Sequence, residues 1–361
     1  MTLQEITTLR LQNQQIITNH SGNIVSLVEK MGALQAQDYA MAKWALGVRM
    51  SSVSDESVNE AIASASIIRT HVLRPTWHFV PARDVVWMTR LSADRIKTSM
   101  RTRDRQLELT EDVFTSSNNI LATALADGKS MTREEIALLL QQKGIRTNEN
   151  RLSHLLMRAE LELIICSGAY RRGKPSFRLL EKCISNPIEL SREESLSTLA
   201  KRYFSAHGPA TIADFVWWSG LSQSEAKQGI EANKHAFESL TINGQIYWMN
   251  RDSQADTTAN SLVHLLPAFD EYLISYRDRS AMIASHHNPK TIYTNGVFRP
   301  VVVVNGKVAG LWSRTIKKEV VTVSIAMFDD FSDDVRSLIK KSVKPYGVFL
   351  GKIVDLTIKA I

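Results

Sequence analysis

Residues 31–50 have the sequence MGALQAQDYAMAKWALGVRM, which carries the most informative pattern in the chain. Its apolar residues repeat with helical spacing, which predicts a buried helix around Gln35. Two carboxamides, Gln35 and Gln37, interrupt that apolar run one residue apart. A buried amide without hydrogen-bond partners costs about 1–3 kcal/mol, so both need a reason to be there. The residues alone leave two reasons open: the amides cap neighbouring backbone groups, or they face a cleft and act on a ligand.

Length, composition and charge predict a multidomain globular protein. The chain has 361 residues, 44% of them hydrophobic and 22% charged, and its net charge of +7 is compatible with a polyanionic partner. The N-terminus has no continuous apolar core and no uncharged apolar run reaches about 18 residues, so we expect neither a signal peptide nor a transmembrane helix. Two cysteines, Cys166 and Cys183, are too few for a zinc site or a disulfide scaffold, and Cys166 is expected in the core. These features fit a reducing cytoplasm.

A local pattern of helix, capped helix and basic strand pair occurs three times along the chain. The copies lie at residues 23–81, 131–180 and 207–250. Clear local signals mark them, namely Pro75 in a turn, a capping box at Thr132 and the hairpin dipeptide at Asn243 and Gly244. This order is the plan of the winged helix-turn-helix, which predicts contact with DNA, although helix–helix–hairpin units also occur in other α+β cores.

The C-terminal part differs, because strand patterns dominate from Ser261 onward. It predicts a small β-barrel or half-barrel with one helix at residues 332–343, and the polar segment 250–260 is the best candidate for a linker. The expected fold is therefore α+β in four parts. They are a first winged-helix region carrying the glutamines (1–127), a second winged helix (128–190), a third (191–255) and the β-barrel domain (261–361).

Several kinds of enzyme are excluded by missing motifs. The sequence has no glycine-rich phosphate loop, no zinc-protease motif and no serine-hydrolase elbow. The adjacent pair His286 and His287 predicts a surface loop rather than a metal site. The acids at 329, 330, 333 and 334 predict a helix N-terminus, where the helix dipole favours negative charge.

With Gln35-Ala36-Gln37 in place, the whole chain resembles the AlkZ-like DNA glycosylases. The most specific matching pieces are LQAQD (34–38), RTHVLRPTWHFVPA (69–82), GPATIADFVWWSGL (208–221), LLPAFDEYLISYRDRS (265–280) and GVFRPVVVVNGKVAGLW (296–312). The resemblance implies tandem winged helices and a C-terminal β-barrel in a C-shaped clamp. It also implies removal of alkylated purines from double-stranded DNA, with crosslink unhooking within the family's range. We expect hydrolysis without metal or cofactor, and no obligate protein partner is evident.

The resemblance assigns the catalytic role to Gln35 and Gln37, because a Gln-aliphatic-Gln motif in the family's concave cleft is needed for base excision. Asp38 lies one position beyond the acid of a sister branch with Gln-aliphatic-Asp and receives no role. An N7- or N3-alkylated purine is cationic, so its glycosidic bond is already weakened. The amides then need only hold a water near C1′ and stabilise the developing charge. On a helix the two side chains would lie about 200° apart, so a shared cleft requires a helix end or a bend.

Basic residues of the expected hairpins and barrel are the DNA-binding candidates. They are Arg69, His71, Arg74 and His78 in the first hairpin, Arg171, Arg172 and Lys174 in the second, and Arg277, Arg279, Arg299 and Arg314 in the C-terminal part. Charged hairpin tips are also common on solvated surfaces, and Asp270, Glu271 and Asp278 are near enough to pair with some of these arginines. Trp77 is expected in the core. The alternative function is a non-catalytic winged-helix DNA-binding protein, which release of free alkylated base would distinguish.

Overall fold

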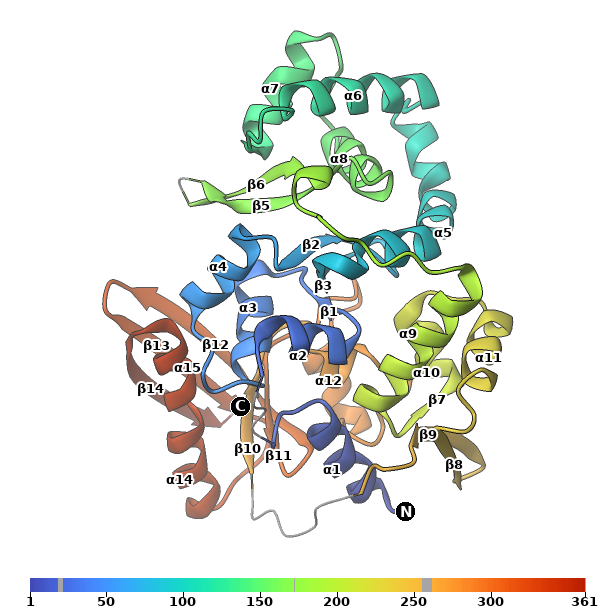
Figure 1. The fold of residues 1–361 in the computed structure, drawn as a ribbon. Coiled ribbons are helices and arrows are strands. Elements are labelled where there is room, and N and C mark those ends of the chain that lie inside the picture. The colour runs from blue at the N-terminus through green and yellow to red at the C-terminus, as the bar shows by residue number, and fades with distance from the viewer. Residues whose placement is uncertain (19–21, 172, 255–261, 361) are drawn as a thin grey trace. The chain divides into compact units, whose positions relative to one another are not determined.

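The computed structural model describes residues 1–18, 22–171, 173–254 and 262–360. The chain forms two compact units. The first comprises Met1–Val58, Ser197–Trp218 and Ser222–Ile361, and the second comprises Asn59–Leu196 and Ser219–Leu221. Figure 1 labels the elements of both units, which are described separately below. The four-part division and the C-shaped clamp stay predictions, and Arg172 and most of the expected linker lie outside the described residues.

The first unit begins with helices whose ends are set by local caps. The helices are α1 (Leu3–Asn13), α2 (Ile24–Met31), α3 (Tyr39–Gly47) and α4 (Asp55–Ala63). The two-residue strand β1 (Leu34–Gln35) lies between α2 and α3, and α4 continues into the second unit. Thr2 and Glu5 form a capping box on α1, and Asn23 and Ser26 form one on α2. Such pairs satisfy backbone N–H groups that a helix start leaves without partners.

The prediction of one continuous helix around Gln35 is wrong. Helix α2 ends at Met31, and Gly32 follows with a φ of +79°. The chain is then extended at β1, and α3 starts only after Asp38, whose side chain accepts a hydrogen bond from Met41 N at 3.0 Å. Gly32 favours this positive φ, and Asp38 is a preferred N-cap residue. Apolar spacing therefore marked two helix ends and the buried strand between them as one helix.

The second unit contains one long helix, three shorter ones and two hairpins. Its elements are β2 (Ile67–His71), β3 (Trp77–Pro81), η1 (Ala82–Asp84), α5 (Val85–Gln106), α6 (Glu111–Ala124), β4 (Met131–Thr132), α7 (Arg133–Gln142), α8 (Arg151–Leu161), β5 (Ile165–Arg171), β6 (Lys174–Leu179) and η2 (Leu180–Lys182). The predicted turn at Pro75 lies between β2 and β3, and the capping box of Thr132 with Glu135 starts α7. Gly144 has the positive φ expected after that helix. Leucines of α6 and α8 pack with Phe114 and Phe177 into one apolar core.

The third copy of the repeated pattern lies almost wholly in the first unit. Its elements are α9 (Arg192–His207), β7 (Ala210–Thr211), α10 (Ile212–Ser219), α11 (Gln223–Glu231), β8 (Phe237–Ile242) and β9 (Gln245–Asn250). Asn243 and Gly244 both have positive φ between β8 and β9, so the predicted hairpin is confirmed. The strand order β7-β9-β8 repeats the order β4-β6-β5 of the second unit. Their assignment as winged helices stays a proposal.

The C-terminal part is an open sheet in the described residues, so the expected closed barrel is not found there. The sheet order is β10-β11-β12-β13-β14. Its strands are β10 (Val263–Leu266), β11 (Val301–Val304), β12 (Lys307–Lys317), β13 (Val320–Met327) and β14 (Ile353–Ala360). Neighbours are antiparallel except β13 and β14, which are parallel and joined through helices, as a parallel connection requires. Figure 1 shows this crossover beside the sheet.

The single C-terminal helix expected at 332–343 is confirmed, but shorter helices accompany it. Helix α14 (Asp333–Ser342) has Ser332 as its N-cap, with Asp333 and Asp334 in the first turn. The additional elements are α12 (Glu271–Ile274), η3 (Ser285–His287), α13 (Asn288–Thr291) and α15 (Lys344–Leu350). These segments are too short for a helical period to show in the sequence. Across the described residues, no helix is long and apolar enough to cross a membrane.

Candidate active site

The glutamine segment is not helical. Gln35 ends the short strand β1 and is 5% exposed, whereas Gln37 lies in the bend before α3 and is exposed. The structure therefore has no helix across the two glutamines, and the 200° separation expected on a helix does not apply. It places one glutamine in the protein interior and the other on the surface beside it.

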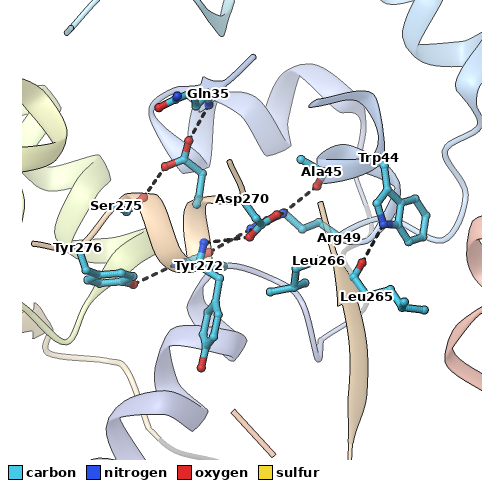
Figure 2. A network of polar contacts seen from close by, with 12 residues as sticks. Gln35, Trp44, Ala45, Arg49, Leu265, Leu266, Asp270, Tyr272, Ser275 and Tyr276 are labelled. Atoms are coloured by element: carbon cyan, nitrogen blue, oxygen red, sulfur yellow. Dashed lines mark hydrogen bonds and ion pairs between the residues drawn. The ribbon is translucent and has the colours of Figure 1, made fainter. Parts of the chain in front are cut away.

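A buried carboxylate fixes the backbone of Gln35. Glu271, at the start of α12, is 1% exposed, and its Oε1 accepts a hydrogen bond from Gln35 N at 2.6 Å. Its Oε2 accepts from Trp218 Nε1 at 3.0 Å and from the hydroxyl of Ser275. Figure 2 shows the bond from Gln35 down to this carboxylate and onward to Ser275. Three donors converge on one side chain, so the position of Gln35 is set by a residue far away in the chain.

The residues before Gln35 are also held from the third copy of the repeat. His207 is fully buried, and its Nε2–H donates to Met31 O at 3.1 Å. Burial lowers the pKa of His207 to about 3, so the ring is neutral near pH 7 and keeps an acceptor as well as a donor nitrogen. A Cβ added at Gly32 would lie 3.2 Å from the indole of Trp218. The turn into the glutamine strand therefore packs against the same tryptophan that contacts Glu271.

The residue before Glu271 anchors α12 through a buried ion pair. Both oxygens of Asp270 accept hydrogen bonds of 2.9 Å from Arg49, and neither side chain is exposed. Arg49 also donates to Gln14 Oε1 at 3.0 Å, and Gln14 donates to the hydroxyl of Tyr276 at 2.9 Å. Asp270 in addition caps α12 by accepting from Tyr272 N. Figure 2 shows Asp270, Arg49 and Tyr276 in one connected network, so Asp270 pairs with Arg49 rather than with the arginines that follow it.

The basic residues of the first hairpin are largely buried. Arg69 packs its guanidinium over the ring of Trp77 at 4.3 Å, and His71 contacts Glu160 through Nδ1. His78 donates from Nδ1 to Thr76 O at 3.0 Å, and burial lowers its pKa well below the ordinary value. Arg69, His71 and His78 are at most 6% exposed, so their side chains serve packing in this structure. Their contact with DNA stays untested.

The remaining first-hairpin candidate and Trp77 are only half-buried. Arg74 follows Leu73, which has a φ of +63°, and its charge adds to the lowering of the His78 pKa. Trp77 has intermediate exposure, so the core role expected for it is only partly realised. Among the four candidates of the first hairpin, Arg74 is the one whose cationic side chain stays partly accessible.

The tip of the second hairpin is accessible, with Lys174 exposed and Arg171 half-buried, but its charges are paired within the same unit. Arg171 forms an ion pair with Glu135 at 3.0 Å, and Lys174 forms one with Glu134 at 3.3 Å. Arg171 also donates to Ser130 O. Exposed ion pairs of this kind are worth about 0–1 kcal/mol, so a phosphate can replace the carboxylate at small cost.

The four C-terminal arginines differ in accessibility. Arg277 is exposed, and its backbone N donates to Asp214 at 2.8 Å. The half-buried Arg279 donates from Nε to Leu273 O at 2.9 Å and lies between the rings of Trp217 and Phe298. Arg299 and Arg314 are also half-buried, with their guanidinium groups near Tyr293 and Tyr346. Arg277 has the clearest access to solvent of the four.

Two features were not predicted from the sequence, Glu271 in the first unit and a run of arginines in the second unit. Glu271 was treated only as a partner for nearby arginines, although it contacts the glutamine segment. The last turns of α5 present the exposed residues Arg101, Arg103 and Arg105, a run that charge counting along 101–105 could have found. No local sequence pattern indicates the hydrogen bond between Gln35 and Glu271, because the two residues are 236 positions apart in the chain.

The described residues contain no group of three or more His, Cys, Asp or Glu side chains able to hold a metal ion. The surface-loop expectation for the histidine pair needs correction, because His287 is buried in η3 and packs on Phe328. The arrangement around Gln35 instead offers amide groups on a firmly held backbone. Such groups can orient a water molecule and stabilise positive charge by their dipoles.

Comparison with known proteins assigns the chain to a protein family. The family model described as "DNA glycosylase AlkZ-like" matches residues 28–349, a range that includes both Gln35 and Glu271. The chain belongs to the AlkZ-like DNA glycosylase family. It is therefore an enzyme that acts on N-glycosyl bonds in DNA, and the non-catalytic alternative is set aside.

One relative is similar in sequence, and one solved structure is similar in fold. An interstrand DNA cross-link repair glycosylase from Streptomyces sahachiroi is 25% identical over 335 residues, which are 87% of this chain and 88% of the relative. The solved structure of the Streptomyces sahachiroi DNA glycosylase AlkZ matches with a TM-score of 0.82 at 20% identity, over 100% of both chains. The expected mixed α+β fold is confirmed by this likeness.

Proposed function

We propose that this AlkZ-like glycosylase hydrolyses the N-glycosidic bond of cationic N7- and N3-alkylated purines in double-stranded DNA. Gln35 and Gln37 are the proposed catalytic residues. Their amide oxygens accept hydrogen bonds from the attacking water and orient it toward C1′, and their dipoles stabilise the oxocarbenium-like charge that develops there. Water adds to C1′ while the bond from C1′ to the base breaks with its electron pair going to the base. The products are the neutral free base, an abasic site and a proton that passes to solvent.

The observation that carries this proposal is the firmly held, non-helical backbone at Gln35. The hydrogen bond from Gln35 N to Glu271 and the packing of Gly32 on Trp218 hold the backbone. Gln37 is exposed and so is accessible to a ligand from solvent.

The chemistry of the leaving group limits the substrates. A cationic alkylpurine departs as a neutral base and needs no proton from the enzyme. A neutral lesion such as uracil or 8-oxoguanine needs an acid, or a stronger base than an amide, as the paired carboxylates of sugar hydrolases illustrate. Glutamines alone therefore favour cationic lesions.

Contact with DNA is proposed through the helix-and-hairpin repeats, acting as winged helices, and through exposed cations. Arg277, Arg171, Lys174 and the α5 run Arg101, Arg103 and Arg105 are accessible for phosphate contacts. Unhooking of interstrand crosslinks is part of the proposal because the curated relative is named for that activity. Bulky N7 adducts would enter an open site more easily than a closed base-flipping pocket.

A panel of single lesions in one duplex sequence tests the proposal. We expect release of 7-methylguanine and 3-methyladenine, seen as free base and as strand cleavage on heating at the resulting abasic site. Uracil, 8-oxoguanine and 1,N6-ethenoadenine should persist under the same conditions. Efficient release of uracil or 8-oxoguanine would show that another acid or base is at work, and the glutamine mechanism would have to be abandoned.

A further inference from the structure

We propose that Glu271 is a positioning residue for catalysis, which acts by holding the backbone of Gln35 in place. This inference rests on the proposed function, because it assumes that Gln35 acts on the substrate. Glu271 itself is buried and reaches the reaction only through the peptide of Gln35. No role in the chemical step follows from the sequence motif alone.

The geometry around the carboxylate is specific for two acceptor oxygens. Oε1 receives the N–H of Gln35, and Oε2 receives the indole N–H of Trp218 and the hydroxyl of Ser275. All three donors belong to residues that are themselves buried. A carboxylate satisfies them together, and hydrogen bonds to an ionised acceptor are roughly twice as strong as neutral ones.

The side chain is held on a helix that cannot shift easily. Helix α12 is capped by Asp270, which is paired with Arg49. At its other end, Tyr203 donates its hydroxyl to Ser275 O at 2.9 Å. From within the helix, Tyr272 donates to Gly306 O at 2.7 Å. These contacts hold α12 in place, and Glu271 on this helix in turn holds the peptide N–H of Gln35.

The consequence for catalysis follows from the strictness of catalytic geometry. A displacement of about 1 Å in a positioned group can lower a rate by about 10²-fold without affecting binding. Glu271→Ala should therefore reduce the single-turnover excision rate by about that factor, while affinity for undamaged DNA stays unchanged. Glu271→Gln keeps one acceptor but turns an NH₂ group toward Trp218 or Gln35. It should restore activity in part.

The second unit offers a matched control at Asp84. This carboxylate is also fully buried and also accepts a hydrogen bond from an indole, that of Trp87 at 2.9 Å. Asp84→Ala removes the same kind of interaction and should lower thermal stability to a similar extent. Because Asp84 lies in the other compact unit, the excision rate per folded molecule should stay at the wild-type value.

The test combines single-turnover rates on 7-methylguanine DNA, affinity for undamaged duplex and the amide ¹H shift of Gln35 in selectively ¹⁵N-labelled protein. We expect a large rate loss only in Glu271→Ala, partial rescue in Glu271→Gln, and an upfield move of the Gln35 amide in both. Rates equal to those of Asp84→Ala, or an unmoved Gln35 amide, would overturn the inference. If Glu271→Ala does not fold, Glu271→Gln carries the same comparison. An inactive wild type with a Glu271-dependent amide shift would instead refute the proposed function and leave the positioning role of the carboxylate standing.

Discussion

The glutamine segment and the second basic hairpin present polar side chains in opposite settings. Gln35 is buried and held by a carboxylate distant in sequence, whereas Arg171 and Lys174 are accessible and paired with Glu135 and Glu134 of the nearby α7. The first arrangement is costly to disturb, because a buried polar group cannot turn to water. The second is readily exchanged for a phosphate. The first setting holds a residue in a fixed position, whereas the second suits reversible electrostatic contact with a phosphate.

The largest loss of stability is expected when the buried ion pair between Arg49 and Asp270 is broken. Arg49→Met leaves Asp270 as an uncompensated buried charge, so the free energy of unfolding should fall by about 3–5 kcal/mol. Urea unfolding of the variant and the wild type measures this loss of free energy. In Arg49→Met/Asp270→Asn the remaining charge is gone, and part of the loss should return. A loss below about 1 kcal/mol in the single variant would show that the network is not the rigid support described above.

A smaller, pH-dependent effect is expected at His207, which holds Met31 before the glutamine strand. Its folded pKa of about 3 lies below the ordinary 6.5, so the unfolded chain binds the extra proton between these values. The stability that His207 contributes is therefore complete above pH 6.5 and declines as pH falls toward 3. At pH 5 the loss should be about 2 kcal/mol.

His207→Gln provides the control, because an amide can still donate to Met31 O but does not titrate. The other histidines whose pKa is lowered, His78, His264 and His287, titrate alike in both proteins, so the difference between the two stability–pH curves isolates His207. Parallel curves for the two proteins from pH 7 to pH 5 would contradict a neutral buried His207.

The smallest effect is expected on the hairpin. Arg171→Ala/Lys174→Ala removes two proposed phosphate contacts. Forming those contacts breaks the ion pairs with Glu135 and Glu134, which offsets part of the gain, so affinity for undamaged duplex should fall only slightly. Arg101→Ala/Arg103→Ala/Arg105→Ala removes exposed cations of α5 and should flatten the slope of log K against log salt more strongly. Each phosphate that the protein no longer neutralises changes that slope by about 0.9. Equal slopes for the α5 variant and the wild type would exclude α5 from the interface, and an unchanged affinity and slope in the hairpin variant would exclude the hairpin.

Local signals in the sequence predicted the local structure well. Asn243-Gly244 specifies a turn and the capping box at Thr132 specifies a helix start through the residues themselves, and both predictions are confirmed. The cores of the repeats follow from apolar spacing in the same way. Cys166 is buried as expected, with its sulfur 3.8 Å from that of Cys183.

Features that depend on distant partners were not predictable from the sequence. The strand at Gln35 replaces a helix because Gly32, Asp38 and the remote Glu271 act together, and apolar spacing reports none of these. Burial of Arg69 and His78 depends on packing around a hairpin whose basic residues look like surface charges in the sequence. Sheet closure likewise depends on whether β10 meets β14, for which the strands carry no local signal.

The central claim is that the two glutamines perform the hydrolysis, and their removal tests it most directly. Single-turnover release of 7-methylguanine should be compared between the wild type and Gln35→Ala/Gln37→Ala, with duplex affinity and thermal unfolding measured on the same samples. Our account predicts an excision rate lower by about 10²–10³-fold, with affinity for undamaged DNA and folding retained. An unchanged excision rate in the double variant would contradict the assignment of both residues, and a collapse of thermal stability would show that the amides serve the fold instead.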